Sequence, residues 1–582
     1  MKLRMLLLCL GLFSTSMTHA SGASAPQWQP WSPQVFEHAK AQHKFVFLYL
    51  EAVWCHWCHV MQQDTFTDIA VQKELAKNYI AVRADHDADP LLAGRYRDYG
   101  WPALIFFAPD GTELVKRAGY MPPEGFARLL ATIVRDPRPE KATAVTTMTG
   151  PSRLPASVRQ NLIKIHDDSY DHKLGGLKGA MKFLDRDSAE YSIVHAAEPE
   201  EAKKATQTLD AARALLDPVW GGVYQYSTGG TWSNPHTEKI MRSQAGYLRI
   251  YALAYARFGR QQDLLTAQAI RDYLKNFLSS PKGGFYVSQD ADLIQGEKTH
   301  DYFALNDVER RKRGMPRIDQ NLYADANGMA AEALVTLYEA SGDGQALTMA
   351  RDALGWAAAH RKLKGGGYRH GQTNGGGPYL GDSLTMGRAF LALYRATAER
   401  EWLTHALQAA QFIQKNFRAR DAGFLSARAA IGPLKPLPDV QENITTARFF
   451  NLLAQYQGDP KLKLQAEHAM KFLSGYADAL TVEEAGILLT DEELSNDAAH
   501  FTIVGTKQDM AAQELFDVAR KTAGSYKRVE WWDKAEGPLS NQDVTYPQFP
   551  KAAGFVCTAG RCSLPSFTPQ NYRRQIKTLL AQ

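Results

Sequence analysis

The feature that most constrains the fold is a pair of cysteines, Cys55 and Cys58, that follows a short apolar run. Residues 45–50 are apolar and rich in aromatics, which is typical of a strand buried on both faces. A helical pattern comes next, so the first cysteine lies at the junction of strand and helix. Free N–H groups and the helix dipole stabilise a thiolate there. The sequence therefore predicts a redox-active pair, with Cys55 as nucleophile and Cys58 as resolving thiol.

The elements around this pair predict a thioredoxin-like α/β fold over residues 27–136. Pro102 opens a later strand at the place where thioredoxin folds put a cis-proline beside the disulfide, and His56 favours the Cys55 thiolate when protonated. The expected helices and strands, in chain order, are helix 32–43, strand 45–50, helices 58–64 and 68–77, strand 79–83, helix 90–99, strands 103–108 and 112–117, and helix 122–134.

Three other interpretations of the same cysteines stay open at this point. With His59, the motif also satisfies CxxCH, the attachment motif of c-type haem. Zinc could use His56 and His59, with Cys557 and Cys562 as further ligands. The pair could also be a purely structural disulfide. The strand before the motif and the hairpin after it favour the thioredoxin interpretation, so we expect no haem, zinc or other metal.

The remainder of the chain changes character after a linker at residues 137–153. Four segments align with one another as helical hairpins, and glycine-aromatic turns such as Gly283-Gly284-Phe285-Tyr286 recur between them. Hairpins of this kind bury their apolar stripes by closing into an α/α toroid or by stacking as a solenoid, and we favour closure. The toroid is expected over residues 154–480. A small α/β region follows at 481–582, where Cys557 and Cys562 predict a structural disulfide, or a relay if they lie near Cys55.

The amino terminus indicates export. Lys2 and Arg4 precede an apolar run, and small residues follow near Ala20. This pattern predicts a signal peptide at residues 1–20, with cleavage as late as residue 25. The mature protein is expected to be periplasmic and soluble. The net charge of +5 over 582 residues is small and scattered, which argues against nucleic acid as a partner.

The chain resembles a family that joins a thioredoxin-like domain to a six-hairpin glycosidase-like toroid, typified by spermatogenesis-associated protein 20 and bacterial YyaL-like proteins. The resemblance covers nearly the whole mature chain and implies this fold and a redox role, without naming a substrate. The motifs that carry it are Cys55-His56-Trp57-Cys58-His59-Val60-Met61, Gly100-Trp101-Pro102, Pro235-His236-Thr237-Glu238-Lys239, Gly284-Phe285-Tyr286 with Asp290-Ala291-Asp292, Asn327-Gly328, and Phe555-Val556-Cys557 with Cys562.

Two functions follow as hypotheses. The first is a thiol-disulfide oxidoreductase that exchanges disulfides with client proteins and with a membrane electron donor or acceptor, while the toroid docks a client or a glycan. The second is a carbohydrate-binding or carbohydrate-processing toroid with an accessory thioredoxin domain, because paired carboxylates or histidines at a barrel mouth suit such chemistry. Polar residues at turns and helix starts are more often caps. The candidate toroid ligands are His236, Glu238, Asp290, Asp292, Asp325 and Asp382.

Overall fold

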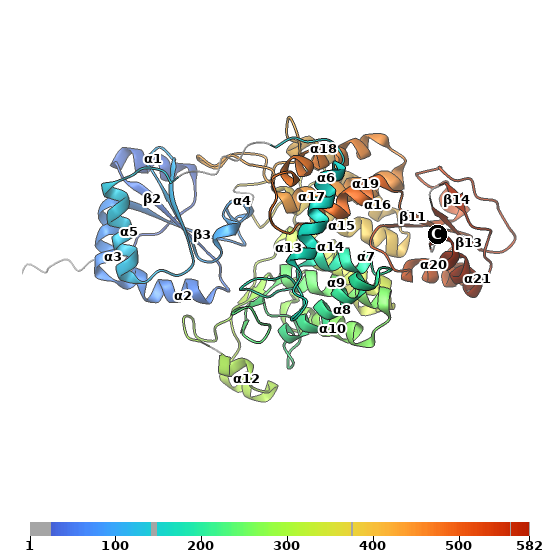
Figure 1. Cartoon of the computed structure of the whole chain (residues 1–582), viewed down its shortest axis with the longest axis horizontal. Helices are drawn as coiled ribbons and strands as arrows, with labels where there is room; N and C mark the ends of the chain where they lie inside the picture. Colours follow the sequence, from blue (N-terminus) through green and yellow to red (C-terminus); the bar gives the residue numbers. More distant parts are fainter. Residues whose placement is uncertain (1–24, 141–147, 299, 374–375, 559, 581–582) are drawn as a thin grey trace, which may run out of the picture.

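The computed structural model describes residues 25–140, 148–298, 300–373, 376–558 and 560–580. The expected signal peptide and part of the expected linker lie outside these residues. The chain forms an N-terminal α/β part, a central mass of helices and a C-terminal α/β part, which follow one another along the long axis of the molecule (Figure 1). None of the described helices is long and apolar enough to span a bilayer.

The N-terminal part is a five-stranded sheet in the order β1-β3-β2-β4-β5. The central strand β2 pairs in parallel with β3 and antiparallel with β4. Helices pack on both faces, which explains why β2 reads as a continuous apolar run. This is the thioredoxin-like fold that the sequence predicted. Its elements are β1 (Gln29–Pro30), α1 (Pro33–Gln42), β2 (Phe45–Glu51), α2 (His56–Gln63), α3 (Ile69–Asn78), β3 (Tyr79–Asp85), α4 (Pro90–Arg95), β4 (Ala103–Phe107), β5 (Glu113–Ala118) and α5 (Pro123–Arg135).

The central helices close into a ring. Within the described residues, six inner helices contact one another in the cyclic order α7, α9, α13, α15, α17, α19 and back to α7. Each inner helix also contacts an outer helix, and α6, from the start of this part, packs on α19 at the end of it. The closed α/α toroid is therefore confirmed. The inner helices are α7 (Arg186–Val194), α9 (Met241–Phe258), α13 (Ala324–Ser341), α15 (Leu380–Thr397), α17 (Val440–Gln457) and α19 (Ala485–Ser495); the outer ones are α6 (Ala156–Ser169), α8 (Pro199–Ala212), α10 (Gln261–Tyr273), α14 (Gly344–His360), α16 (Arg400–Phe417) and α18 (Pro460–Ala477).

The toroid ends later than the sequence suggested. Helix α19 contacts α17 and α7 and so completes the inner ring, although it lies beyond the boundary expected at residue 480. The apolar pattern of a single helix does not show which helices it contacts, so the end of the ring is visible only in the contacts of α19. The expected region 481–582 therefore contains the last helix of the ring as well as the α/β part.

The glycine-aromatic turns connect outer helices to the next inner helices. Gly284 has a positive φ, and a side chain there would collide with Asn327 and with the Trp356 ring of α14. The Asn327 side chain accepts a hydrogen bond from the Phe285 N–H at 2.7 Å and donates to the Tyr323 carbonyl at 2.8 Å. The turns thus deliver the chain to the end of the ring where the inner helices begin, which we call the mouth.

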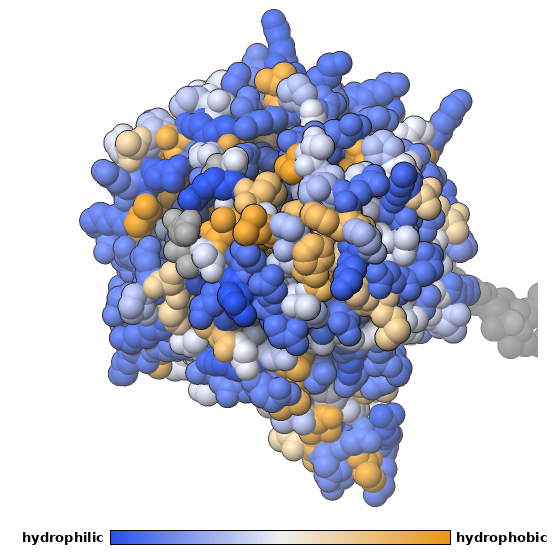
Figure 2. All heavy atoms as spheres, turned by 90° about the vertical axis from the view of Figure 1, so that its right-hand side faces the viewer, coloured by the Kyte–Doolittle hydropathy of each residue, from blue (hydrophilic) through white to orange (hydrophobic). Residues whose placement is uncertain are grey.

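The C-terminal part is a four-stranded sheet in the order β12-β11-β13-β14. Cys557 and Cys562 pair across β13 and β14 and form a disulfide. The face that this part presents to solvent is largely hydrophilic, with apolar side chains near its centre (Figure 2). Its elements are β11 (Ala499–Val504), α20 (Met510–Lys521), β12 (Lys527–Trp532), β13 (Ala553–Thr558), β14 (Arg561–Cys562) and α21 (Pro569–Leu580).

The described chain also has short pieces between the larger elements. The strands β8, β9 and β10 form a small sheet beside the mouth. These shorter pieces are β6 (Tyr226–Ser227), β7 (Pro235–His236), β8 (Lys239–Ile240), β9 (Ser288–Gln289), β10 (Ile318–Asp319), α11 (His300–Phe303), α12 (Asp307–Arg313), and the short helical turns Thr65–Thr67, Arg97–Tyr99, Arg213–Leu215, Leu274–Leu278 and Lys534–Glu536.

Candidate redox site between the thioredoxin-like part and the toroid

The two cysteines form a disulfide at the start of α2. Strand β2 leads into the motif, and Cys55 is the N-cap residue of α2, with its Sγ accepting a hydrogen bond from the Cys58 N–H at 3.1 Å. Cys55 is 3% exposed and Cys58 is fully buried. The helix N-terminus stabilises negative charge on the Cys55 sulfur when the pair is reduced. The geometry therefore suits attack through Cys55 and resolution by Cys58.

Aromatic residues enclose the disulfide. The Trp101–Pro102 peptide bond is cis, as the position of Pro102 predicted. The rings of Trp54 and Trp101 meet edge to face with centroids 5.0 Å apart. The Tyr49 hydroxyl donates a hydrogen bond to the Cys58 carbonyl at 2.9 Å. These contacts fix α2 on the sheet and shield the disulfide from water.

A carboxylate of the toroid binds both histidines of the redox motif. Asp292 accepts a hydrogen bond from His56 Nδ1 at 2.7 Å and another from His59 Nδ1 at 3.1 Å. Burial alone would lower the pKa of His59, but the hydrogen bond to Asp292 and the charges of Asp290 and Asp292 raise it above its usual value. Burial would raise the pKa of Asp292, but the two histidines hold it below its usual value. The toroid thus supplies a charged partner to the CxxCH motif.

Asp290 lies on the other side of His59. Its Oδ1 accepts the backbone N–H of Asp292 at 3.0 Å, and its Oδ2 lies 3.7 Å from His59 Nε2 without a hydrogen-bond partner among the described residues. His59 Nε2 also lies 3.1 Å from the Val53 carbonyl. Burial raises the pKa of Asp290 to about 7, with Asp292 and Glu238 adding repulsion. One buried histidine is therefore surrounded by acceptors from both parts of the chain.

Toroid residues 288–296, here called the covering segment, lie against the redox motif. The Ala291 N–H points to the Trp54 carbonyl at 3.4 Å, and Gln63 donates to the Gln295 carbonyl at 2.6 Å. Ile240, also from the toroid, packs against the apolar cluster that contains both cysteines. The low exposure of Cys55 agrees with this arrangement.

His370 forms a second bridge between the two parts, and sequence reasoning missed it. Its Nε2 donates to the Asp87 carbonyl at 2.7 Å, and its Nδ1 donates to Asp382 at 2.8 Å, with Asp325 at 3.5 Å. Burial would lower the pKa of His370, but Asp382 and Asp325 raise it to about 10. The Asp87 carboxylate also accepts a hydrogen bond from Trp54 Nε1 at 2.7 Å. This imidazolium therefore links the toroid to a residue that supports the redox motif.

The structure distributes the six candidate toroid residues over three places. Asp290 and Asp292 contact the redox motif, and Asp325 and Asp382 contact His370, as described above. His236 stacks on Tyr226 with centroids 4.4 Å apart, and its Nδ1 lies 3.9 Å from the Glu238 carboxylate. Glu238 is 4% exposed, and its Oε2 has no hydrogen-bond partner in the described part of the chain.

Further carboxylates gather at the mouth, at the N-terminal ends of inner helices. Burial and the charge of Asp439 raise the pKa of Glu442 to about 8, and burial with Asp185 raises the pKa of Glu484 to about 8. Arg97 of the thioredoxin-like part forms an ion pair with Asp439 at 3.0 Å. The mouth is therefore acidic, partly protonated at neutral pH, and tied to the thioredoxin-like part. The sequence analysis did not single out Glu442 or Glu484.

Two sets of residues have the composition of a divalent cation site. Ligand atoms of His59, Asp290 and Asp292 lie within 4.8 Å of one another, as do those of the second set, Asp325, His370 and Asp382. In both sets the histidine nitrogens already contact oxygen acceptors, and the carboxylates raise the histidine pKa. The observed arrangement thus suits an imidazolium between carboxylates.

The residues do not fit c-type haem. That attachment needs both cysteine sulfurs for thioether bonds and the following histidine as an iron ligand. Here the two sulfurs are bonded to each other, and His59 is buried between Asp292 and the Val53 carbonyl.

The second cysteine pair lies far from the first. Cys557 and Cys562 belong to the C-terminal part, on the opposite side of the toroid from the thioredoxin-like part (Figure 1). The hypotheses that these cysteines complete a zinc site with His56 and His59, or relay electrons to Cys55, were therefore wrong. Sequence alone could not separate them, because the closed toroid sets the distance between the two ends of the chain.

Comparison with known proteins supports this organisation. The family model Thioredox_DsbH, described as "Protein of unknown function, DUF255", matches residues 15–146. Spermatogenesis-associated protein 20 of Mus musculus is 27% identical over 305 residues, which cover 46% of this chain and 38% of the relative. The chain thus matches well under two thirds of that relative's length. Thiol:disulfide interchange protein DsbD 1 of Pseudomonas aeruginosa is 36% identical over 110 residues, covering 17% of this chain and 18% of the relative.

Among solved structures, D-mannose isomerase covers 58% of this chain and 96% of its own, with 12% identity and a TM-score of 0.46. The assignment of the toroid rests on the ring of helix contacts described above. The N-terminal region of this chain is similar to the thioredoxin-like family DUF255, and 46% of the chain is similar to spermatogenesis-associated protein 20, which agrees with the resemblance that the motifs predicted.

Proposed function

We propose that the protein exchanges disulfides with client proteins through Cys55 and Cys58. The observation that carries this proposal is the disulfide itself, whose Cys55 caps the N-terminus of α2. A helix N-terminus favours the thiolate that exchange requires. The similarity of the N-terminal region to a protein named for thiol:disulfide interchange points the same way.

The exchange runs in two steps. With the pair reduced, the Cys55 thiolate attacks one sulfur of a client disulfide, forms a mixed disulfide and releases the other client sulfur as a thiolate. Cys58 then loses its proton and attacks the Cys55 sulfur, which releases the client as a dithiol and leaves the pair oxidised. The reverse sequence oxidises a client dithiol. We propose an exported, periplasmic protein, for which a membrane protein with a dithiol or disulfide would reset the pair.

The toroid restricts access to this chemistry in our proposal. Asp292 holds both histidines of the motif, and the covering segment lies beside a cysteine that is only 3% exposed. A client must move this segment to reach Cys55. We infer that the toroid selects clients, by docking a protein or a glycan attached to it.

Trapping the mixed disulfide tests the proposal. A Cys58→Ser variant of the whole chain, reduced and mixed with glutathione disulfide as the probe, should accumulate one glutathione on Cys55, because the resolving thiol is missing. A Cys55→Ser variant is the matched control and should stay largely unmodified, because Cys58 is buried. Equal modification of both variants, or of neither, would contradict the assignment of Cys55 as nucleophile.

A carbohydrate-processing toroid is the second candidate, and the mouth favours it. Glycosidic bond cleavage needs a carboxylic acid that stays protonated at neutral pH beside an ionised carboxylate. Glu442, with its pKa raised to about 8, lies near Asp439, which pairs with Arg97. Release of reducing sugar from oligosaccharides that survives Cys55→Ser and disappears in Glu442→Gln would support this function. Full dependence on Cys55 would contradict it.

A further inference from the structure

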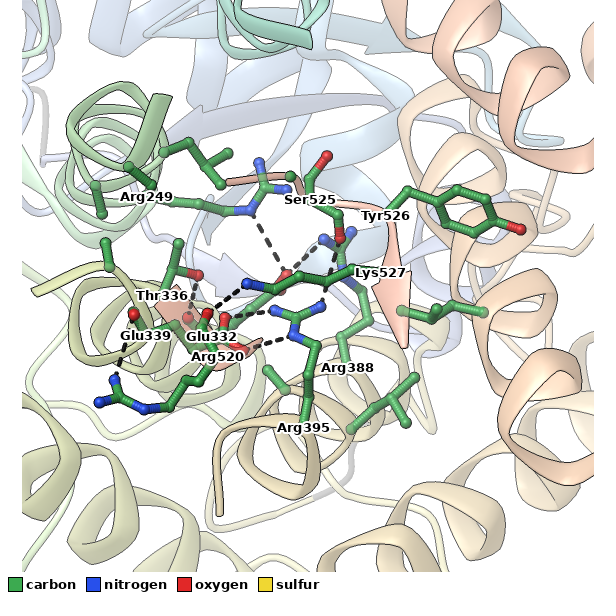
Figure 3. Close-up of a pocket in the computed structure, with 18 of the residues that line it drawn as sticks. Arg249, Glu332, Thr336, Glu339, Arg388, Arg395, Arg520, Ser525, Tyr526 and Lys527 are labelled. Atoms are coloured by element: carbon green, nitrogen blue, oxygen red, sulfur yellow. Dashed lines mark hydrogen bonds and ion pairs between the residues drawn. The ribbon is translucent and has the colours of Figure 1, made fainter. Parts of the chain in front are cut away.

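The far end of the toroid, opposite the mouth, contains a pocket with an excess of positive charge. It lies between the C-terminal halves of the inner helices and residues 520–527, which run from the end of α20 to the start of β12 (Figure 3). Its volume is about 60 Å³, enough for several waters or one small oxyanion. The helices present charged residues at helical spacing, such as Glu332 with Glu339 and Arg388 with Arg395.

The carboxylates of this pocket are already paired. Glu190 takes bidentate hydrogen bonds from Arg249 and from Arg448, and Arg448 also binds Glu493 at 2.6 Å. Glu332 binds Arg388 at 2.6 Å, and Glu339 binds Arg395 through both oxygens at 2.7 and 2.8 Å. The cations that line the pocket are Arg249, Arg388, Arg395, Arg448, Arg520, Lys521 and Lys527, whereas the carboxylates that pair with them are Glu190, Glu332, Glu339, Glu493 and Asp517.

Lys527 carries unbalanced charge, and Arg520 shares the single carboxylate of Asp517 with Lys521. Lys527 is 4% exposed, and its Nζ donates to the backbone carbonyls of Arg520 at 2.5 Å and Thr522 at 2.7 Å. In the part of the chain that the structure describes, it forms no ion pair. Burial lowers the pKa of Lys527 to about 8; the charge of Glu339 opposes this shift, and the charges of Arg395 and Arg520 add to it. Arg520 is 2% exposed, and its Nε has no partner among the described residues. A buried ammonium without a counterion costs stability that a bound anion would restore.

We propose that this pocket binds a small tetrahedral dianion of the phosphate or sulfate type. Guanidinium groups donate paired N–H hydrogen bonds to the oxygens of such anions. The Lys527 ammonium would donate a further hydrogen bond from another side of the anion. Side chains from the helices and from residues 520–527 point toward the same space (Figure 3). A bound dianion would neutralise the excess charge and join the C-terminal part to the ring. The site is remote from the cysteines and serves a purpose separate from the redox proposal.

Calorimetric titration and thermal unfolding of the full chain test this site. Inorganic phosphate is the probe, sulfate is the second probe, and sodium chloride at equal ionic strength is the reference. One phosphate should bind per chain and raise the unfolding temperature, because a ligand that binds only the folded state stabilises it. The Lys527→Met variant should bind phosphate at least about tenfold more weakly, whereas Lys534→Met, an exposed lysine of the same region, should bind normally.

The two variants also give a thermal readout. Phosphate should raise the unfolding temperature of Lys534→Met as it raises that of wild type, whereas Lys527→Met should show a much smaller rise. Failure of the wild-type protein to bind phosphate or sulfate would overturn the proposal. Equal phosphate affinity in wild type and Lys527→Met would overturn it as well. If Lys527→Met does not fold, the wild-type titration alone decides the question.

Discussion

Replacing Asp292 with asparagine should accelerate reduction of the Cys55–Cys58 disulfide. Asp292 accepts charge-assisted hydrogen bonds from His56 at 2.7 Å and His59 at 3.1 Å, and it anchors the covering segment through the Gly296 N–H at 2.8 Å. An amide of the same shape keeps part of this bonding but loses the charge. Charge-assisted hydrogen bonds contribute about 1.5–3 kcal/mol each and neutral ones about 1 kcal/mol, so we expect a net loss of about 2 kcal/mol.

This loss should appear in the rate at which the segment opens. If opening must precede attack on Cys55, about 2 kcal/mol corresponds to about a 30-fold faster reduction. The assay is reduction of the full chain by excess dithiothreitol, with timed alkylation and mass spectrometry to count free thiols at the pair. Asp301→Asn, an exposed carboxylate paired with Arg313, is the matched control and should reduce at the wild-type rate.

A second variant separates opening from a direct effect of charge. Gln63→Ala removes the hydrogen bond to the Gln295 carbonyl without changing any charge, and should accelerate reduction by about fivefold for a loss of about 1 kcal/mol. Rates within about twofold of wild type in both Asp292→Asn and Gln63→Ala would refute the argument that the covering segment controls access to the disulfide.

Three further predictions concern stability. The His370 imidazolium, with its pKa raised to about 10, should contribute on the order of 5 kcal/mol to the free energy of unfolding. This contribution is fully present below about pH 6.5 and is lost as the pH rises through 10, so urea unfolding between pH 7 and 10 should show a steeper loss of stability in wild type than in His370→Gln. A Cys557→Ser variant should lose about 2 kcal/mol of unfolding free energy in the same assay, because the disulfide closes only a short loop. The variant should keep the exchange activity of Cys55. Asn327→Ala should lower the free energy of unfolding by about 3 kcal/mol, because Asn327 is fully buried and forms hydrogen bonds with the Phe285 N–H and with two carbonyls. An unfolding curve unchanged from wild type would contradict its role in holding the turn.

The thioredoxin-like part could be predicted in detail because its signals are local. A buried strand, the cysteine motif and a proline-opened strand define the sheet without knowledge of the rest of the chain. Helix α2 nevertheless begins at His56, before the expected Cys58, because Cys55 itself caps the helix. Local patterns also predicted helical hairpins, but the sixth inner helix was assigned to the next region, because only the contacts of α19 with α17 and α7 reveal that the ring closes there.

The bridges between the two parts could not be predicted, because they join residues far apart in sequence. His370 binds Asp87 across 283 positions, and His56 binds Asp292 across 236. One sequence feature could have identified residues at the mouth. Residues that follow a glycine-aromatic turn lie at the mouth, and Asp290 and His370 both follow such turns. Asp290 was among the predicted toroid ligands, whereas His370 was not.

The most direct test of the central claim is the reduction potential of the Cys55–Cys58 pair. The purified protein would be equilibrated with glutathione buffers of graded potential, and the free thiols of each pair would be counted by mass spectrometry. We predict one two-electron transition at this pair, absent in Cys55→Ser and in Cys58→Ser and retained in Cys557→Ser. A pair that stays oxidised across the whole range, or a transition that persists in Cys55→Ser, would contradict the claim that Cys55 and Cys58 are the redox centre.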